Sequence, residues 1–343
     1  DLNVYATASG HKGLRFGNGY LAPTGNSTTV ENGTTDLGLS THRFKDLYMT
    51  GTANIGDIKL DAIAKDISDT AVDVFIYDTR KDSDGGAWRK RTQHTSWYNE
   101  TLNTATRGAR KEFPAVAVIV SEINQITIYD GDDPDLPMWM IFNQGGSWNS
   151  SSNMIMPTSP DPVSVSALNG ILSIAYSSGY GVGILNFISE SKIAIFANNV
   201  TKYNNDISQR NNSWGHYDAP DARRIANSAV NDVAMTVLPN APIDAATGLP
   251  VPTIAVATAA NVSIIRDNGT VVDITYANYN DARNIYFNSK NHLIYSHYNS
   301  ATQSAAKVYY EIPSSDLANP QGGYQRGAET VYYAKSGISP DIN

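Results

Sequence analysis

The sequence predicts an all-β protein with a small N-terminal β segment and a larger β-propeller-like domain. The first observation is composition: the 343 residues are 41% hydrophobic and 17% charged, with 26 glycines and 20 tyrosines. Such a composition is typical of short strands joined by polar turns. The second observation is that apolar segments of strand length recur in sets beyond about residue 75, which indicates a repeat architecture.

Residues 1–60 are predicted to form a β segment that needs partners. Its large apolar side chains, such as Leu14 and Phe16, are few and lie among many Gly, Thr and Asn residues. A segment of about 60 residues buries too little surface to be stable alone, even with a good core. Turn residues at Gly17-Asn18-Gly19 and Asn32-Gly33 indicate short strands between them.

Residues 61–75 are predicted to be a short coiled coil or a linker. Apolar and threonine side chains recur there at the a and d spacing of a heptad seam. Two heptads also fit one amphipathic turn or a strand between two domains, so these alternatives stay open. The seam consists of Leu60, Ile63, Ile67, Thr70 and Val74.

Residues 76–343 contain the repeat, and we expect this domain to continue beyond residue 343. Two sets of four strands are complete, and two further sets are partial. The first complete set is Val163–Leu168, Ile171–Tyr176, Gly183–Ile188 and Lys192–Phe196. The second is Asn231–Val237, Thr253–Thr258, Asn261–Ile265 and Thr270–Tyr276. The partial sets are Ala115–Val120, Gln125–Tyr129 and Pro137–Phe142, and Ala282–Phe287, His292–Ser296 and Lys307–Glu311.

Units of four strands that cannot bury both faces alone are typical of stacked propeller blades. A β-sandwich or jelly roll also contains many short strands at regular spacing, so it is the alternative.

A basic, aromatic segment is the candidate binding site. Residues 80–111 contain eight basic side chains and only three acidic ones. Arginine and aromatic side chains suit contact with an anionic glycan or an acidic protein. The alternative is a structural segment whose arginines pair with carboxylates of a neighbouring protomer. The candidate binding residues are Trp88, Arg89, Lys90, Arg91, Trp97 and Tyr98.

The acidic loop Asp130–Asp135 has the carboxylate density of a calcium site. Because Asp, Gly and Pro are also turn formers and the rest of an EF-hand is missing, a metal-free turn is favoured. The six histidines are scattered, and the sequence has no nucleophile elbow, Walker loop or dinucleotide fingerprint. We therefore expect no catalytic residues, no metal and no cofactor.

Charge and cysteine content limit the partners further. With 25 basic against 33 acidic residues, the net charge of −8 argues against nucleic-acid binding. There are no cysteines, which excludes disulfides and thiolate metal sites. No apolar run reaches the ~18 residues of a membrane span, so no membrane insertion is expected.

The stretch Asp36–Gly51, DLGLSTHRFKDLYMTG, resembles a signature of bacteriophage tail fibres. Residues Arg89–Glu100 and Phe113–Val118 resemble segments of large virion proteins of marine phages. The resemblance implies a virion protein located in the tail or fibre. It also implies that residues 1–60 are a homotrimeric shaft, in which three copies supply the core that one copy lacks.

The function expected from this resemblance is adhesion to the host surface or scaffolding of the fibre. The partners would be other tail or capsid proteins and a host glycan or protein receptor. A glycan depolymerase, which needs a carboxylate pair in a groove, and an internal tail or capsid connector are the alternatives.

Overall fold

A computed structural model describes residues 2–5, 12–18, 20–24, 28–30, 70–145, 155–156, 161–212, 215–276, 281–299, 303–309, 312–318 and 331–335. The chain divides into two compact units, Asp1–Lys59 and Leu60–Asn343. The all-β prediction is confirmed, because the regular elements of the described residues are strands and three short 3-10 helices.

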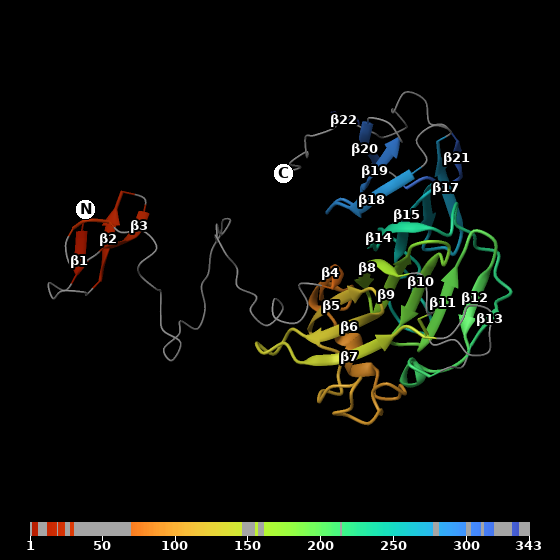
Figure 1. The fold of residues 1–343 in the computed structure, drawn as a ribbon, viewed down its shortest axis with the longest axis horizontal. Helices are drawn as coiled ribbons and strands as arrows, with labels where there is room; N and C mark the ends of the chain where they lie inside the picture. Colours follow the sequence, from red (N-terminus) through yellow and green to blue (C-terminus); the bar gives the residue numbers. More distant parts are fainter. Residues whose placement is uncertain are drawn as a thin grey trace. The chain divides into compact units, whose positions relative to one another are not determined.

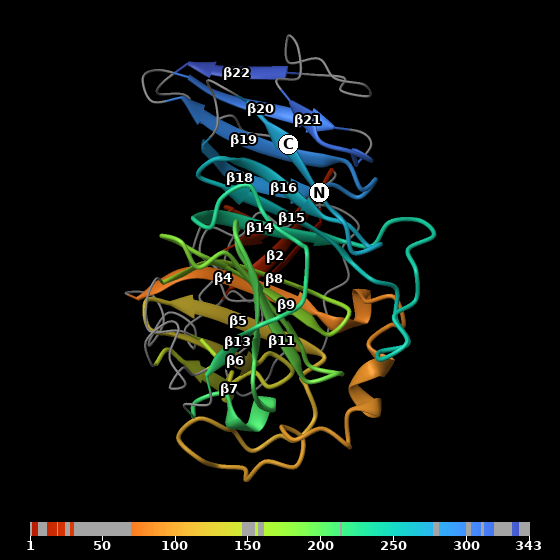
Figure 2. The same cartoon turned by 90° about the vertical axis from the view of Figure 1, so that its right-hand side faces the viewer.

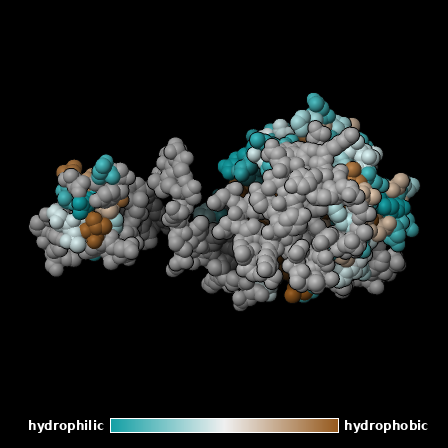
Figure 3. All heavy atoms as spheres, turned by 90° about the horizontal axis from the view of Figure 1, so that it is seen from above, coloured by the Kyte–Doolittle hydropathy of each residue, from teal (hydrophilic) through white to brown (hydrophobic). Residues whose placement is uncertain are grey.

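The first unit contains one three-stranded antiparallel sheet. Leu2 lies opposite Phe16, and Phe16 lies opposite Leu21, so these three side chains share one face. Val4 and Leu14 form the next pair on that face. Leu2 is 62% exposed and Phe16 45%, and hydrophobic surface is visible on this unit in Figure 3. The strands are β1 (Leu2–Tyr5), β2 (Gly13–Gly17) and β3 (Tyr20–Thr24).

The second unit contains four sheets, which we call blades 1 to 4 in chain order (Figure 1). Blade 1 consists of β4 (Ala71–Asp78), β5 (Val116–Glu122), β6 (Gln125–Asp130) and β7 (Met138–Asn143). Blade 2 consists of β8 (Pro162–Leu168), β9 (Ile171–Tyr176), β10 (Val182–Asn186), β11 (Ser191–Ile195), β12 (Val200–Tyr203) and β13 (His216–Asp218).

The remaining strands form blades 3 and 4. Blade 3 consists of β14 (Val230–Thr236), β15 (Thr253–Thr258), β16 (Asn261–Ile265), β17 (Val271–Thr275) and β21 (Leu317–Ala318). Blade 4 consists of β18 (Asp281–Phe287), β19 (Leu293–Asn299), β20 (Gln303–Tyr309) and β22 (Val331–Lys335). The 3-10 helices are η1 (Thr79–Lys81), η2 (Ala87–Arg91) and η3 (Ile207–Gln209).

The blades stack through their first strands, with β4 against β8, β8 against β14 and β14 against β18. Figure 2 shows the sheets as successive layers. Within each blade, consecutive strands pair antiparallel, except that β21 joins β17 in parallel. A stack of meander sheets joined by their first strands is propeller-like.

Apolar side chains fill the space between blades. One core, between blades 1 and 2, is aromatic and includes Trp88, Trp97, Trp139 and Phe187. A second core contacts blades 2 and 3 and is aliphatic; it includes Val182 and Ile254. In blade 3 both faces are therefore buried within one chain, and every residue of β15 is buried.

The predicted strand sets of blades 2 and 3 lie where expected, and those of blade 4 lie where expected within the described residues. Blade 1 differs, because its first strand, β4, occupies residues that the heptad spacing assigned to the linker. Val74 lies in β4, where Val72, Val74 and Ile76 alternate outward to solvent. This end of the segment is therefore a strand, one of the alternatives left open, and not a coiled coil. Leu60, Ile63 and Ile67 lie outside the described residues.

Candidate functional site

The first strand of every blade carries a β-bulge near its start. The register shifts by one residue at Val72 in β4, Val163 in β8, Asn231 in β14 and Arg283 in β18. A bulge inserts one extra residue and redirects the side chains around it. Each bulge is followed by a polar residue and then by Val or Ile, a repeat that is visible in the printed sequence. The polar residues are Asp73, Ser164, Asp232 and Asn284.

Three of these polar residues connect neighbouring blades. Asp73 Oδ2 accepts a hydrogen bond of 2.8 Å from the Val165 backbone N–H of blade 2. The Ser164 hydroxyl donates to Asp232 Oδ1 of blade 3 at 2.6 Å. Asp232 Oδ2 in turn accepts from the Ile285 N–H of blade 4 at 2.7 Å. The bulges therefore direct short polar side chains at the adjacent blade, where the two aspartates accept from backbone N–H groups and Ser164 donates to a carboxylate.

The same strands line a groove of about 350 Å³, the candidate functional site that draws on all four blades. It brings together two carboxylates, Asp73 and Asp232, that the sequence did not single out. Burial raises the pKa of Asp232, although bonds from Ser164 and backbone N–H groups oppose the increase. Both oxygens of Asp232 accept bonds from this chain, so the geometry favours a connector between blades over a reacting acid.

The six predicted binding residues are not one surface. Trp88 and Trp97 are completely buried in the core between blades 1 and 2, so the prediction that they stack on a ligand is wrong. The indole N–H of Trp97 donates to the Phe187 carbonyl at 2.8 Å. The error has a physical reason: interleaved basic and aromatic residues fit a binding surface, but here the rings fill the core while the charges stay outside.

The basic members pair within the chain. Arg91 donates to Asp84 at 2.8 Å, and Arg89 donates to the Phe113 carbonyl at 3.1 Å. These bonds give both arginines partners within the chain, whereas the structural alternative assigned their partners to a neighbouring protomer. Lys90 is exposed, and Tyr98 is partly buried with the ammonium of Lys111 5.6 Å from its ring centre.

A buried carboxylate explains why Trp88 lies inside. Asp82 Oδ2 accepts from the Trp88 indole N–H at 2.7 Å and from the Tyr77 hydroxyl at 2.5 Å. Its other oxygen accepts from the Asn169 N–H of blade 2 at 2.9 Å. Burial raises the pKa of Asp82, and these three donors oppose the increase. The Asn169-Gly170 turn between β8 and β9 thus also anchors the segment after β4.

A second buried cluster joins the same segment to blade 2. Arg107 and Arg210 are both essentially unexposed, and both lie next to Glu100. Arg210 donates to Glu100 at 2.8 Å and to the Ile141 carbonyl of β7 at 2.7 Å. Burial lowers the pKa of Arg107 to about 10, with Glu100 opposing and Arg210 adding to the decrease. Sequence patterns did not predict this cluster, because Arg210 is 110 residues away from Glu100 in the chain.

The acidic loop is tied to a guanidinium. Arg110 donates to Asp130 at 2.8 Å and to Asp132 at 2.7 Å. Asp132 also accepts from the N–H groups of Ala115 and Val116 at 2.8 and 2.9 Å. Burial would raise the pKa of Asp132, but these bonds lower it below its ordinary value. Among the described residues no cluster of His, Asp and Glu has the arrangement of a metal site.

Lys192 is a buried base that the sequence did not reveal. It lies on β11 with 3% exposure, and its Nζ donates to the Ile155 carbonyl. The ring of Tyr176 is 6.0 Å away. Burial lowers the pKa of Lys192 to about 7. No carboxylate among the described residues pairs with its ammonium group to oppose this decrease.

In the ranges that the structure describes, no helix has the length and hydropathy to cross a bilayer.

Comparisons with known proteins identify no family. No family model matches the chain, and no curated protein matches it. Among solved structures, BBS1N in complex with ARL6DN aligns at 9% identity and TM-score 0.30, over 59% of this chain and 50% of that one. The chain thus spans about half the length of BBS1N.

Two further structures align at similar scores. A protein of unknown function from Bacteroides caccae gives 13% identity and TM-score 0.28, over 55% of this chain and 51% of that one. Hsv2p of Kluyveromyces lactis gives 10% identity and TM-score 0.24, over 59% and 73%. At these scores the alignments carry no argument about function.

Proposed function

We propose that the protein is a virion structural protein of the tail-fibre type, in which the first unit joins copies of the chain and the blades form a rigid adhesion or scaffolding module. The observation that carries the proposal is the exposed apolar face of the sheet β1–β3. The signature-like stretch 36–51 supports it through resemblance; those residues lie outside the described ones.

The apolar face has the properties of an assembly surface. Leu2, Phe16 and Leu21 cross all three strands side by side, with exposures of 62%, 45% and 57%. Contiguous apolar surface of this kind marks interaction sites, and a sheet this small is marginal without a packing partner. Three copies related by rotation would each present this face to a common axis, which favours a homotrimer.

The blades suit adhesion or scaffolding because their carboxylates are hydrogen-bonded within the chain. Asp82, Glu100 and Asp232 are all engaged with donors of this chain. Three copies of such a module bind a repetitive host surface, or the rest of the tail, with an avidity that single weak contacts lack. Lys90 and Arg91, the exposed basic residues among the six candidates, are the part of that segment that would meet an anionic partner.

Detection in purified virus particles tests this function. We expect peptides of the chain in particles purified by density gradient, and antibody against the blades to label the tail in electron micrographs. The control antibody is raised against a major capsid protein. Peptides found in infected-cell lysate but missing from particles would overturn the proposal.

The depolymerase alternative rests on the Asp73 and Asp232 pair in the groove. It predicts that the full chain shortens host polysaccharide and that Asp73→Asn abolishes the shortening while leaving the melting temperature nearly unchanged. We expect no shortening by either protein. If the full chain shortened the polysaccharide and the Asp73→Asn variant did not, the protein would be a depolymerase, and this would replace the adhesion proposal.

A further inference from the structure

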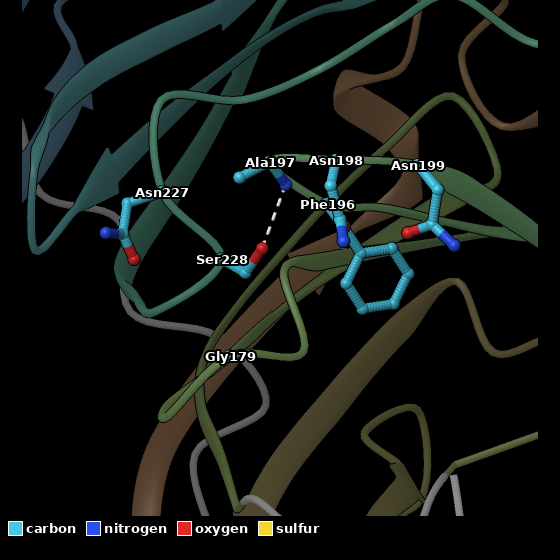
Figure 4. Close-up of a pocket in the computed structure, with 7 residues that line it drawn as sticks. All are labelled: Gly179, Phe196, Ala197, Asn198, Asn199, Asn227 and Ser228. Carbon is cyan, nitrogen blue, oxygen red and sulfur yellow. Dashed lines mark hydrogen bonds between the residues drawn. The ribbon is translucent and has the colours of Figure 1, made fainter. Parts of the chain in front are cut away.

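A polar pocket of about 470 Å³ lies between blade 2 and the segment that leads into blade 3 (Figure 4). Its volume is within the range of small-molecule sites, about 300–1,000 Å³. Phe196, Asn198 and Asn199 come from the turn between β11 and β12, and Gly179 comes from the turn between β9 and β10. Asn227 and Ser228, which precede β14, form the opposite side.

Hydrogen bonds fix the pocket's framework. Ser228 accepts from the Ala197 N–H through its hydroxyl at 2.8 Å and from the Gly181 N–H through its carbonyl at 2.7 Å. The Phe196 carbonyl accepts from the Ile225 N–H at 3.1 Å. The turns of blade 2 are therefore fastened directly to the segment before β14. A site held in this way is pre-formed, which lowers the ordering cost of binding.

Several amide groups at the pocket keep capacity for a ligand. The exposed side chain of Asn198 has no hydrogen-bond partner among the described residues. Asn227 uses its Oδ1 to accept from the Ala229 N–H at 2.8 Å, which leaves its two N–H donors. Asn199 donates to Asp218 at 3.0 Å, which leaves its Oδ1 acceptor. Unused amide donors and acceptors of these three asparagines thus lie around the same pocket.

None of the described residues that line the pocket has an ionisable side chain. Without a cation, an anionic ligand gains nothing from the site, and the whole protein repels it through a net charge of −8. A neutral ligand rich in hydroxyl groups matches the site, since each hydroxyl both donates and accepts as the amides do. Gly179, at a φ of +104°, leaves open space where a side chain would project.

We infer that this pocket binds a neutral, hydroxyl-rich saccharide through the amides of Asn198, Asn199 and Asn227. As a means of host adhesion the inference rests on the proposed function, but the binding itself does not. Sequence patterns did not predict this site, because its residues are common turn formers that come from separate loops.

Saturation-transfer NMR with the full chain tests the inference. The probes are maltohexaose, cellohexaose, chitohexaose and mannohexaose, with a heparin hexasaccharide and a Gly-Ser hexapeptide as comparisons. We expect at least one neutral hexasaccharide to give transfer and the heparin fragment and peptide to give none. We expect Asn198→Ala to weaken that binding at least tenfold. Asn124→Ala, which removes an exposed amide from the β5–β6 turn, is the matched control and should bind normally.

Asn198→Asp retains the shape of the side chain and removes its donors, so it should also weaken binding with an unchanged melting temperature. The inference would be overturned if none of the four neutral hexasaccharides gave saturation transfer, or if the heparin fragment or the peptide gave equal transfer. It would also be overturned if both Asn198 variants bound as the natural chain does. Because binding is measured on the chain in any oligomeric state, its failure is distinguishable from absence of the chain from virus particles.

Discussion

The sheet β1–β3 and the blades handle their apolar faces in opposite ways. In blade 3 every residue of β15 is buried between neighbouring sheets. In the first unit, Leu2 and Leu21 remain more than half exposed on one face. Blade 3 thus completes its core within one chain, whereas in our proposal the N-terminal sheet is covered by other copies of the chain. Substitutions in the blades should therefore change the stability of each chain, and substitutions on the N-terminal face should change assembly.

The largest effect is expected from Arg210→Met, which would remove the hydrogen-bonded ion-pair partner of Glu100 and a donor to each of two backbone carbonyls, those of Ile141 and Thr106. Breaking a buried ion pair costs about 3–5 kcal/mol. Urea unfolding followed by tryptophan fluorescence measures the loss. Arg223→Met, which breaks a more exposed pair with Asp221, should cost about 0–1 kcal/mol. Equal costs for both would show that the cluster does not hold the blades together.

Asp232→Asn should destabilise the chain by about 1–3 kcal/mol, because an amide cannot accept at both positions and leaves a buried donor unpaired. Asp135→Asn, on an exposed loop residue, is the control. The same urea experiment measures both variants. A loss no greater than that of the control would mean that the bulge residues do not connect the blades.

Lys192 should make stability depend on pH. Burial lowers its folded pKa from 10.5 to about 7. Between these values the unfolded chain binds the proton that the folded chain has lost, so stability rises with pH, by at most about 1.4 kcal/mol per pH unit. Lys192→Met should flatten this rise and stabilise the protein near pH 7. A slope that is identical in the two proteins would contradict the buried, unpaired lysine.

Asp132→Asn should have the smallest effect, about 1 kcal/mol, because the carboxylate is partly exposed. The lowered pKa means that its contribution is present above the ordinary pKa and is lost as pH falls through the folded value. Asp133→Asn is the control and should change nothing. Melting curves should show a difference between the two variants at pH 7 that becomes smaller at pH 3.

Local patterns predicted the blades well and the buried polar clusters poorly. The apolar segments Val163–Leu168 and Ile171–Tyr176 predicted β8 and β9, because an apolar segment of strand length is a local signal. β4 was misassigned since Val74 also fits a heptad spacing. The sequence prediction places Trp88 on the surface, because no local pattern shows that its indole donates to a buried Asp82. That carboxylate is also bonded by the Asn169 N–H of another blade. Local sequence patterns therefore did not predict contacts between segments that are distant in the chain.

The mass of the full chain in solution, measured by light scattering, tests the central claim most directly. We predict the mass of a trimer for the natural sequence, a monomer for Leu21→Glu, and a trimer for Ala22→Glu. These two substitutions lie on opposite faces of β3, and both variants should retain the urea midpoint of the blades. A monomeric natural chain, or a trimer that persists in the Leu21 variant, would contradict the assembly role of the apolar face.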